Sequence, residues 1–184
     1  MRKVVAIEYV TLDNVMETPV WTQPYFSEEV GHLQDRHIQD RHLQAADLLL
    51  LGRITYDGMS GAWPKAEDDE GGFARRINTL PKEVVTSRKG DLNWNATPLA
   101  PDHLLKRVRE LRQQGGANIL IYGSGQVVRP LLDAGLLDEL HLLLCPLSVG
   151  QGKKLFDGNV KLKPTKTETF SQGITLLTFE PASD

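Results

Sequence analysis

Short apolar runs alternate with amphipathic stretches along most of the chain. The apolar runs lie at residues 3–10, 47–51, 83–86, 118–122 and 139–145, and each has the length of a strand. Segments that are apolar throughout are typical of strands covered on both faces in a parallel sheet. The pattern therefore predicts five buried strands separated by helices.

Amphipathic stretches supply the helices between these strands. The first begins at Ser27, a favourable N-cap, and is expected to end near Ala46. Others are predicted from residue 53 to 59, from 101 to 114 and from 126 to 134, where apolar residues recur on one helical face. Helices between parallel strands cover both faces of the sheet.

The remaining stretches read as loops and a terminal hairpin. Residues 11–24 and 61–72 have loop composition, and the acidic run at 67–70 is expected to be solvated. After residue 163 two β-rich segments flank Gln172 and Gly173, which predicts an antiparallel pair. We therefore expect one α/β domain over residues 1–184, with a mostly parallel sheet that ends in an antiparallel hairpin.

Composition and charge narrow the classes of function. The chain has 184 residues and a net charge of −3, and its basic residues form no stripe, so we expect no nucleic-acid partner. No apolar run approaches the roughly 20 residues that cross a bilayer, so we expect no membrane partner. With one cysteine the chain cannot form an internal disulfide, so we expect a cytoplasmic location. The single cysteine, Cys145, lies in an apolar run and is expected to be inert packing.

Three histidines in the first predicted helix suggest a metal site at first sight. His32, His37 and His42 are spaced by five residues, so that each is turned by about 140° from the one before. Side chains at these angles do not converge on one ion, and a polar helix face is the simpler interpretation. The sequence therefore predicts no metal site.

A glycine turn gives the most informative local pattern. Gly123, Ser124 and Gly125 follow a predicted strand and open a predicted helix, where amide groups and the helix dipole can hold a phosphate. Glycine allows the backbone to approach such a ligand closely. The turn lacks the third glycine of the Rossmann fingerprint, so by itself it is also compatible with a purely structural turn.

Two further strand ends carry similar chemistry. Gly52, Arg53 and Thr55 combine a turn, a cation and a hydroxyl after the second apolar run, and Thr86, Ser87 and Arg88 follow the third. Guanidinium and hydroxyl groups suit pyrophosphate and the 2′-phosphate that separates NADP from NAD. Each stretch alone is equally readable as a polar turn, but together they suggest one long ligand.

In this order and spacing the three stretches resemble the dihydrofolate-reductase-like superfamily, in particular the reductase domain of bacterial bifunctional riboflavin-biosynthesis deaminase-reductases. A glycine-rich segment at residues 146–156 is similar to a loop of the same branch. The resemblance covers nearly the whole chain. It implies a three-layer α/β/α fold, a homodimer, and an NADPH-dependent oxidoreductase, dihydrofolate-reductase-like or 5-amino-6-(5-phosphoribosylamino)uracil reductase-like.

The resemblance also implies roles for individual residues. The cofactor-binding set would be Gly52, Arg53, Thr55, Thr86, Ser87, Arg88, Tyr122, Gly123, Ser124, Gly125, Gln126 and Val127. In the first loop Thr11 to Asn14 stand where relatives carry Ser-Leu-Asp-Gly, so Asp13 keeps the acid and becomes the candidate catalytic residue. Trp21, Tyr25 and Phe26 are candidates for stacking on a flat substrate, or for sealing a core edge or a dimer interface.

These expectations describe hydride transfer from NADPH to a small molecule, with a pyrimidine- or pterin-like ring as one candidate. A proton donor is also needed, and Asp13, Tyr122 and an ordered water all remain open. The substituted first loop leaves a second interpretation, an NADP-binding module without turnover. A third, an interaction protein that uses its exposed aromatic residues, would bind no nucleotide.

Overall fold

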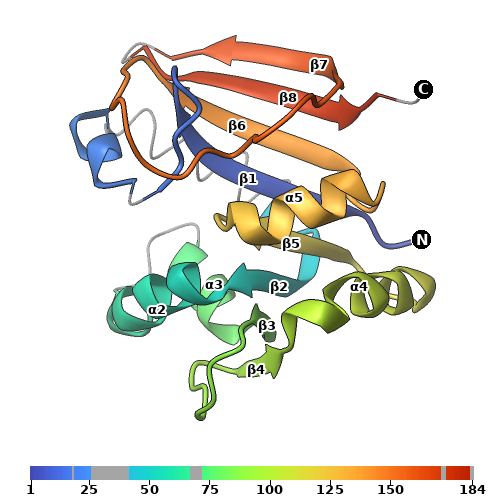
Figure 1. Cartoon of the computed structure of the whole chain (residues 1–184). Coiled ribbons are helices and arrows are strands. Elements are labelled where there is room, and N and C mark those ends of the chain that lie inside the picture. The colour runs from blue at the N-terminus through green and yellow to red at the C-terminus, as the bar shows by residue number, and fades with distance from the viewer. Residues whose placement is uncertain (18, 26–41, 67–71, 171–172, 183–184) are drawn as a thin grey trace.

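A computed structural model describes the chain apart from residues 18, 26–41, 67–71, 171–172 and 183–184. Its described strands form one eight-stranded sheet in the order β4-β3-β2-β5-β1-β6-β8-β7 (Figure 1). The strands are β1 (Val4–Thr11), β2 (Ala46–Gly52), β3 (Lys82–Val85), β4 (Ala96–Leu99), β5 (Asn118–Tyr122), β6 (Glu139–Cys145), β7 (Leu162–Thr169) and β8 (Thr175–Pro181).

In the order of the sheet, each neighbouring pair from β4 across to β6 is parallel. Only the C-terminal strands β7 and β8 form antiparallel pairs. β8 runs antiparallel to β6, and β7 runs antiparallel to β8. The expected mostly parallel sheet with a terminal antiparallel hairpin is therefore confirmed. Strand β4 was not predicted, because it is short, partly exposed and contains Pro98. It lies at the sheet edge, where a proline is tolerated.

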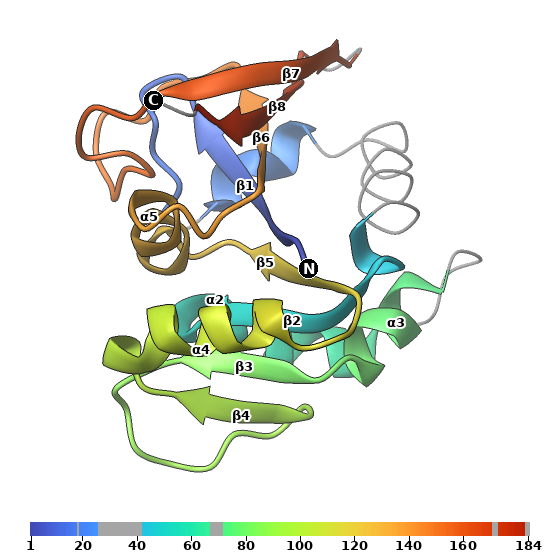
Figure 2. The ribbon, with the colours of Figure 1, turned by 90° about the vertical axis from the view of Figure 1, so that its right-hand side faces the viewer.

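Helices cover both faces of the sheet, as the alternation predicted. They are α2 (Arg53–Ala62), α3 (Phe73–Thr79), α4 (Leu104–Gln113) and α5 (Gly125–Asp133), with 3-10 turns η1 (Pro19–Tyr25), η3 (Trp63–Lys65) and η4 (Pro101–His103). Residues of α4 and α5 join one apolar core, and residues of α2 and α3 join the other (Figure 2). The result is a three-layer α/β/α arrangement.

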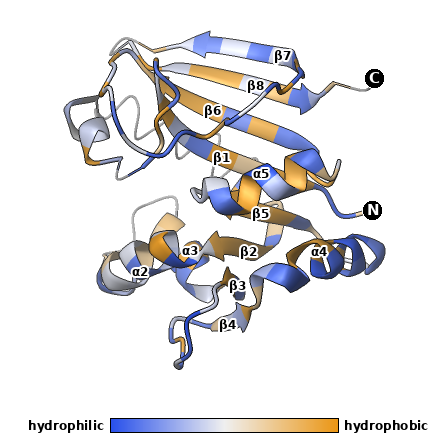
Figure 3. Ribbon diagram, viewed as in Figure 1, coloured by the Kyte–Doolittle hydropathy of each residue, from blue (hydrophilic) through white to orange (hydrophobic). Residues whose placement is uncertain are grey.

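Burial explains why the central strands are so uniformly apolar. In β2, Leu48 and Leu50 face the core under α4 and α5, while Leu49 and Leu51 face the other core. Figure 3 shows the central strands β2 and β5 as mainly apolar and the outer side of α4 as hydrophilic. Successive side chains of a strand point to opposite faces, so a strand covered on both faces needs apolar residues at odd and even positions alike.

Several predicted boundaries require correction. The first helix cannot extend to Ala46, because strand β2 begins there, and its predicted start at Ser27 lies outside the described residues. The predicted loop 61–72 is partly helical, since α2 runs to Ala62 and η3 follows. The acidic run 67–70 also lies outside the described part. Helix α3 was missed because its seven residues offer too little periodicity.

Burial also settles two earlier interpretations. Cys145 is fully buried, and this burial raises the pKa of its thiol to about 11, so it is packing rather than a nucleophile. His42 is only 8% exposed, so its assignment to a polar helix face was wrong. No helix in the described part of the chain is long and apolar enough to cross a bilayer.

Candidate functional site

The turns after β2 and β5 lie against each other at the carboxyl ends of these strands. The Gly52 N–H donates to Ser124 Oγ at 2.8 Å, and Thr55 Oγ1 lies 2.8 Å from the same oxygen. Ser124 thus joins two turns that are far apart in sequence. In open α/β sheets, this end of the strands is where ligands bind.

Glycine is required in these turns because the backbones approach closely. A Cβ atom on Gly52 would lie 2.5 Å from Ser124 Oγ, and one on Gly123 would lie 2.9 Å from Thr55 Oγ1. Gly123 also has a φ of +57°, in the left-handed region. Ser124 itself has a φ of 81°, which is uncommon for a residue with a side chain and is often found at functional turns.

Helix α5 begins directly at this junction. Gly125 and Gln126 lie in its first turn, where amide groups have no acceptor within the helix. The Val127 amide donates to the Ser124 carbonyl at 2.7 Å, and the Val127 side chain is fully buried. Val127 therefore builds the turn through its backbone and contributes its side chain to the core.

The two predicted phosphate-binding arginines meet at one carboxylate. Arg53 Nε donates to Asp57 at 2.7 Å, and Arg88 Nη1 lies 3.5 Å from the other oxygen of Asp57. Thr86 Oγ1 accepts from the Arg88 backbone N–H at 3.0 Å, and Ser87 is exposed beside it. All three predicted motifs are thus gathered at one end of the sheet. Sequence analysis missed Asp57, although its i, i+4 spacing from Arg53 is a detectable signal.

The first loop is held by Asp13. Its carboxylate accepts from Thr11 Oγ1 at 2.5 Å and from the Gly150 amide at 2.7 Å, which ties the loop to the glycine-rich segment. The hydrogen bond from Thr11, followed by those from the loop amides, keeps the pKa of Asp13 well below its usual range despite the opposing effect of desolvation. Asp13 is therefore ionised at neutral pH.

An open hollow lies beside this loop. Its volume is about 400 Å³, and it is lined by Val15, Glu17, Trp21, Val149, Gln151 and Gly152. The Trp21 indole N–H donates to the Glu17 carbonyl at 3.3 Å, which fixes the ring at the wall. Phe26 and the side chain of Tyr25 lie outside the described part, so their predicted stacking role stays a prediction.

Two buried polar side chains lack hydrogen-bond partners among the described residues. The Tyr122 hydroxyl and Glu8 Oε1 are both in this position. Tyr122 ends β5 immediately before Gly123, and burial raises the pKa of its hydroxyl well above the usual value. Glu8 lies within β1, and burial likewise raises the pKa of its carboxyl. Sequence reasoning named Tyr122 but missed Glu8, which sits among apolar neighbours as an isolated charge.

The sheet order, the terminal hairpin and the glycine turns at the strand ends define a three-layer α/β protein with a mostly parallel sheet. Within that class the chain belongs to the RibD C-terminal domain family, whose model matches residues 2–176. A curated relative, the uncharacterised protein YyaP of Bacillus subtilis strain 168, is 28% identical over 72% of this chain and 73% of its own length.

Solved structures share the fold at low sequence identity. A Shewanella sp. PV-4 protein provisionally assigned to riboflavin biosynthesis has a TM-score of 0.67 and 15% identity, covering 98% of this chain and 99% of its own. A pyrimidine reductase-like protein of Corynebacterium diphtheriae has a TM-score of 0.63 and 13% identity, covering 100% and 93%.

A third structure belongs to a two-activity protein. The diaminohydroxyphosphoribosylaminopyrimidine deaminase/5-amino-6-(5-phosphoribosylamino)uracil reductase of Thermotoga maritima has a TM-score of 0.62 and 16% identity. The match covers 98% of this chain but only 57% of the Thermotoga chain. The family model matches residues 2–176, and the three solved structures share the fold of the chain.

Proposed function

We propose that this protein is an NADPH-dependent reductase that transfers a hydride to a small molecule with a pyrimidine- or pterin-like ring. The observation that carries the proposal is the junction at Ser124, which draws the turns after β2 and β5 together beside the start of α5. The reductase-like family membership supports the same reaction class. Two solved neighbours have names in line with this proposal: one is called a pyrimidine reductase-like protein and the other a 5-amino-6-(5-phosphoribosylamino)uracil reductase.

The residues at the strand ends fit a dinucleotide phosphate. The first-turn amides of α5, with Arg53 and Thr55, would hold the pyrophosphate, since a helix start and a guanidinium both attract anions. Thr86, Ser87 and Arg88 would hold the 2′-phosphate of NADPH. The glycines let the two turns pack closely against each other, which brings the strand-end side chains together. When bound, the nicotinamide supplies the hydride.

For the proton, we propose Tyr122 rather than Asp13. Tyr122 is partly buried, its hydroxyl oxygen is buried and has no hydrogen-bond partner among the described residues, and the raised pKa of the hydroxyl keeps the proton in place at neutral pH. Asp13 is ionised and fully engaged in holding its loop. Accordingly, Tyr122→Phe is expected to lower kcat with little change in NADPH affinity, and an unchanged kcat would exclude this role.

The hollow beside the first loop is the proposed substrate position. Trp21 offers a fixed aromatic wall for a flat ring, and Glu17 and Gln151 offer polar groups for its edges. Asp13 acts on this position indirectly, because it holds the glycine-rich segment that contributes Val149 and Gly152 to the wall. Asp13 is thus a positioning residue in this proposal.

Three arginine variants test the cofactor assignment. Arg53→Ala should weaken NADPH and NADH alike, whereas Arg88→Ala should weaken NADPH by about 10- to 100-fold and NADH much less, as expected for a lost charged hydrogen bond. Arg109→Ala removes an exposed positive charge from α4 and is the matched control. Dissociation constants from calorimetry measure all three. Equal losses for both dinucleotides at Arg88 would contradict its 2′-phosphate role.

A further inference from the structure

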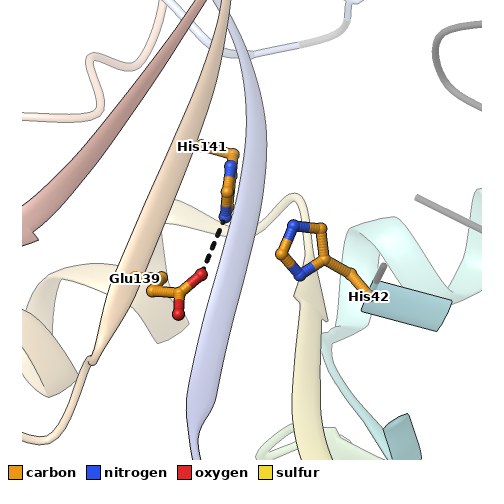
Figure 4. A group of neighbouring side chains, drawn as sticks. All are labelled: His42, Glu139 and His141. Carbon is orange, nitrogen blue, oxygen red and sulfur yellow. Dashed lines mark hydrogen bonds and ion pairs between the residues drawn. The ribbon is translucent and has the colours of Figure 1, made fainter. Parts of the chain in front are cut away.

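His42, Glu139 and His141 converge at a place that the proposed reductase chemistry does not use. The three side chains point toward one another, and one potential ligand atom from each lies within 4.8 Å of the other two (Figure 4). Glu139 and His141 are two residues apart on β6, so they share one face of the strand. His42 comes from the segment that precedes β2.

The distances suit a small divalent cation. Glu139 Oε2 lies 3.4 Å from His141 Nε2. Zinc bonds to nitrogen and oxygen are about 2.0–2.1 Å long, so two ligand atoms of a zinc tetrahedron are separated by about 3.4 Å. The His42 and His141 ring centroids are 4.3 Å apart with planes tilted by 56°, so the two imidazoles lie next to each other at the same place.

Neighbouring groups orient the carboxylate and one imidazole. Thr178 Oγ1 lies 3.2 Å from His141 Nδ1, which directs Nε2 toward Glu139. Lys3 Nζ donates to Glu139 Oε1 at 2.7 Å, so the other oxygen faces His141. Metal-binding imidazoles and carboxylates usually have such outer partners, because these fix the ring and the tautomer.

Burial and position separate this group from the proposed cofactor site. His42 and His141 are 8% and 7% exposed, and the Glu139 side chain is 23% exposed, which leaves a route for an ion. Glu139 opens β6 and lies opposite Val5 near the start of β1. The group therefore sits toward the amino ends of the strands, whereas Gly52, Ser124 and Arg88 lie at the carboxyl ends.

We propose that His42, Glu139 and His141 bind one divalent cation of the zinc type, with a solvent ligand completing the coordination. Two imidazoles and a carboxylate are ligands that Zn²⁺ accepts, and Mg²⁺ and Ca²⁺ prefer oxygen donors. The ion would link β6 to the segment before β2. Sequence reasoning could not find the site, because His42 was compared only with histidines of its own predicted helix.

Titration of the chelator-treated protein with ZnCl₂, followed by calorimetry, tests the site directly. One equivalent is expected to bind, and CoCl₂ is expected to give the visible absorption of a four-coordinate site. His42→Gln and Glu139→Gln should each weaken Zn²⁺ binding at least about 10-fold. His103→Gln is the matched control, because His103 is exposed beside Asp102 and lies outside the group.

A second variant removes an outer partner rather than a ligand. Lys3→Met deletes the group that orients the Glu139 carboxylate, so Zn²⁺ binding should weaken, but less than when Glu139 itself is replaced. Retained circular dichroism spectra show that each variant folds. The site is overturned if no saturable Zn²⁺ binding occurs, or if His42→Gln and Glu139→Gln have no more effect than His103→Gln. NADPH binding is measured separately, so failure of the metal site leaves the proposed function untouched.

Discussion

At the scale of single residues, Glu8 is the most unusual feature of the core. It lies in β1 with 1% of its surface exposed, and burial raises the pKa of its carboxyl well above 4.5. The folded protein therefore retains a proton that the unfolded chain loses. Proton binding at Glu8 therefore favours the folded state. This stabilisation is fully present below about pH 4.5 and is lost as the pH rises toward the folded-state pKa.

We accordingly predict that Glu8→Gln stabilises the protein at pH 8, because the folded state then no longer depends on a carboxyl that burial keeps protonated. The gain should shrink as the pH falls toward 4.5, because the glutamine does not titrate. Urea denaturation at several pH values measures this. Glu110→Gln, on the exposed side of α4, should change stability by less than about 0.5 kcal/mol. A pH-independent effect of Glu8→Gln would contradict the account.

Residue types in the turns were predictable, but their partners were not. Gly52, Thr55 and Ser124 were each selected from the sequence for a phosphate, because strand-turn-helix patterns are local. The contact that joins Ser124 to Gly52 spans 72 positions and depends on strand order, which no local pattern contains. The same limit hid the group formed by His42 and His141.

At the scale of elements, the junction of the two turns gives a direct test. Gly52→Ala places a methyl group 2.5 Å from Ser124 Oγ, so the turn after β2 must move away from α5. Overpacking of this kind costs about 1–3 kcal/mol. We expect a lower Tm and weaker NADPH binding, measured by thermal denaturation and calorimetry.

A glycine in the helix that follows Gly52 provides the control. Gly58 lies in α2, and a Cβ there would meet nothing within 4 Å. Gly58→Ala should leave NADPH binding unchanged and raise stability by up to about 1 kcal/mol, because alanine favours helix. If Gly52→Ala bound NADPH as well as Gly58→Ala does, the junction would not be part of the cofactor site.

Element prediction succeeded where burial made the pattern simple. Strands β5 and β6 begin and end where the apolar runs at residues 118–122 and 139–145 do. Strand β4 and helix α3 were missed, since an exposed four-residue edge strand and a seven-residue helix carry little periodicity. The first helix was extended into Ala46, because its apolar face merges with the buried strand that follows.

At the scale of the whole molecule, the parallel order β3-β2-β5 brings three separate strand ends to one side of the sheet. This order unites the three motifs that the sequence presents far apart, and it leaves His42, Glu139 and His141 toward the opposite end. The sequence suggested that the three motifs share one long ligand, and the family resemblance implied that this ligand is NADPH, but neither predicted the strand order. The homodimer that the resemblance implies stays a prediction.

Calorimetric titration of the purified protein with NADPH and, separately, with NADH tests the central claim most directly. The arrangement of Arg88 beside Thr86, near the junction at Ser124, predicts saturable binding with one NADPH per chain. NADH should bind about 10-fold or more weakly, because it lacks the 2′-phosphate. Absence of binding by either dinucleotide would contradict the proposed reductase function.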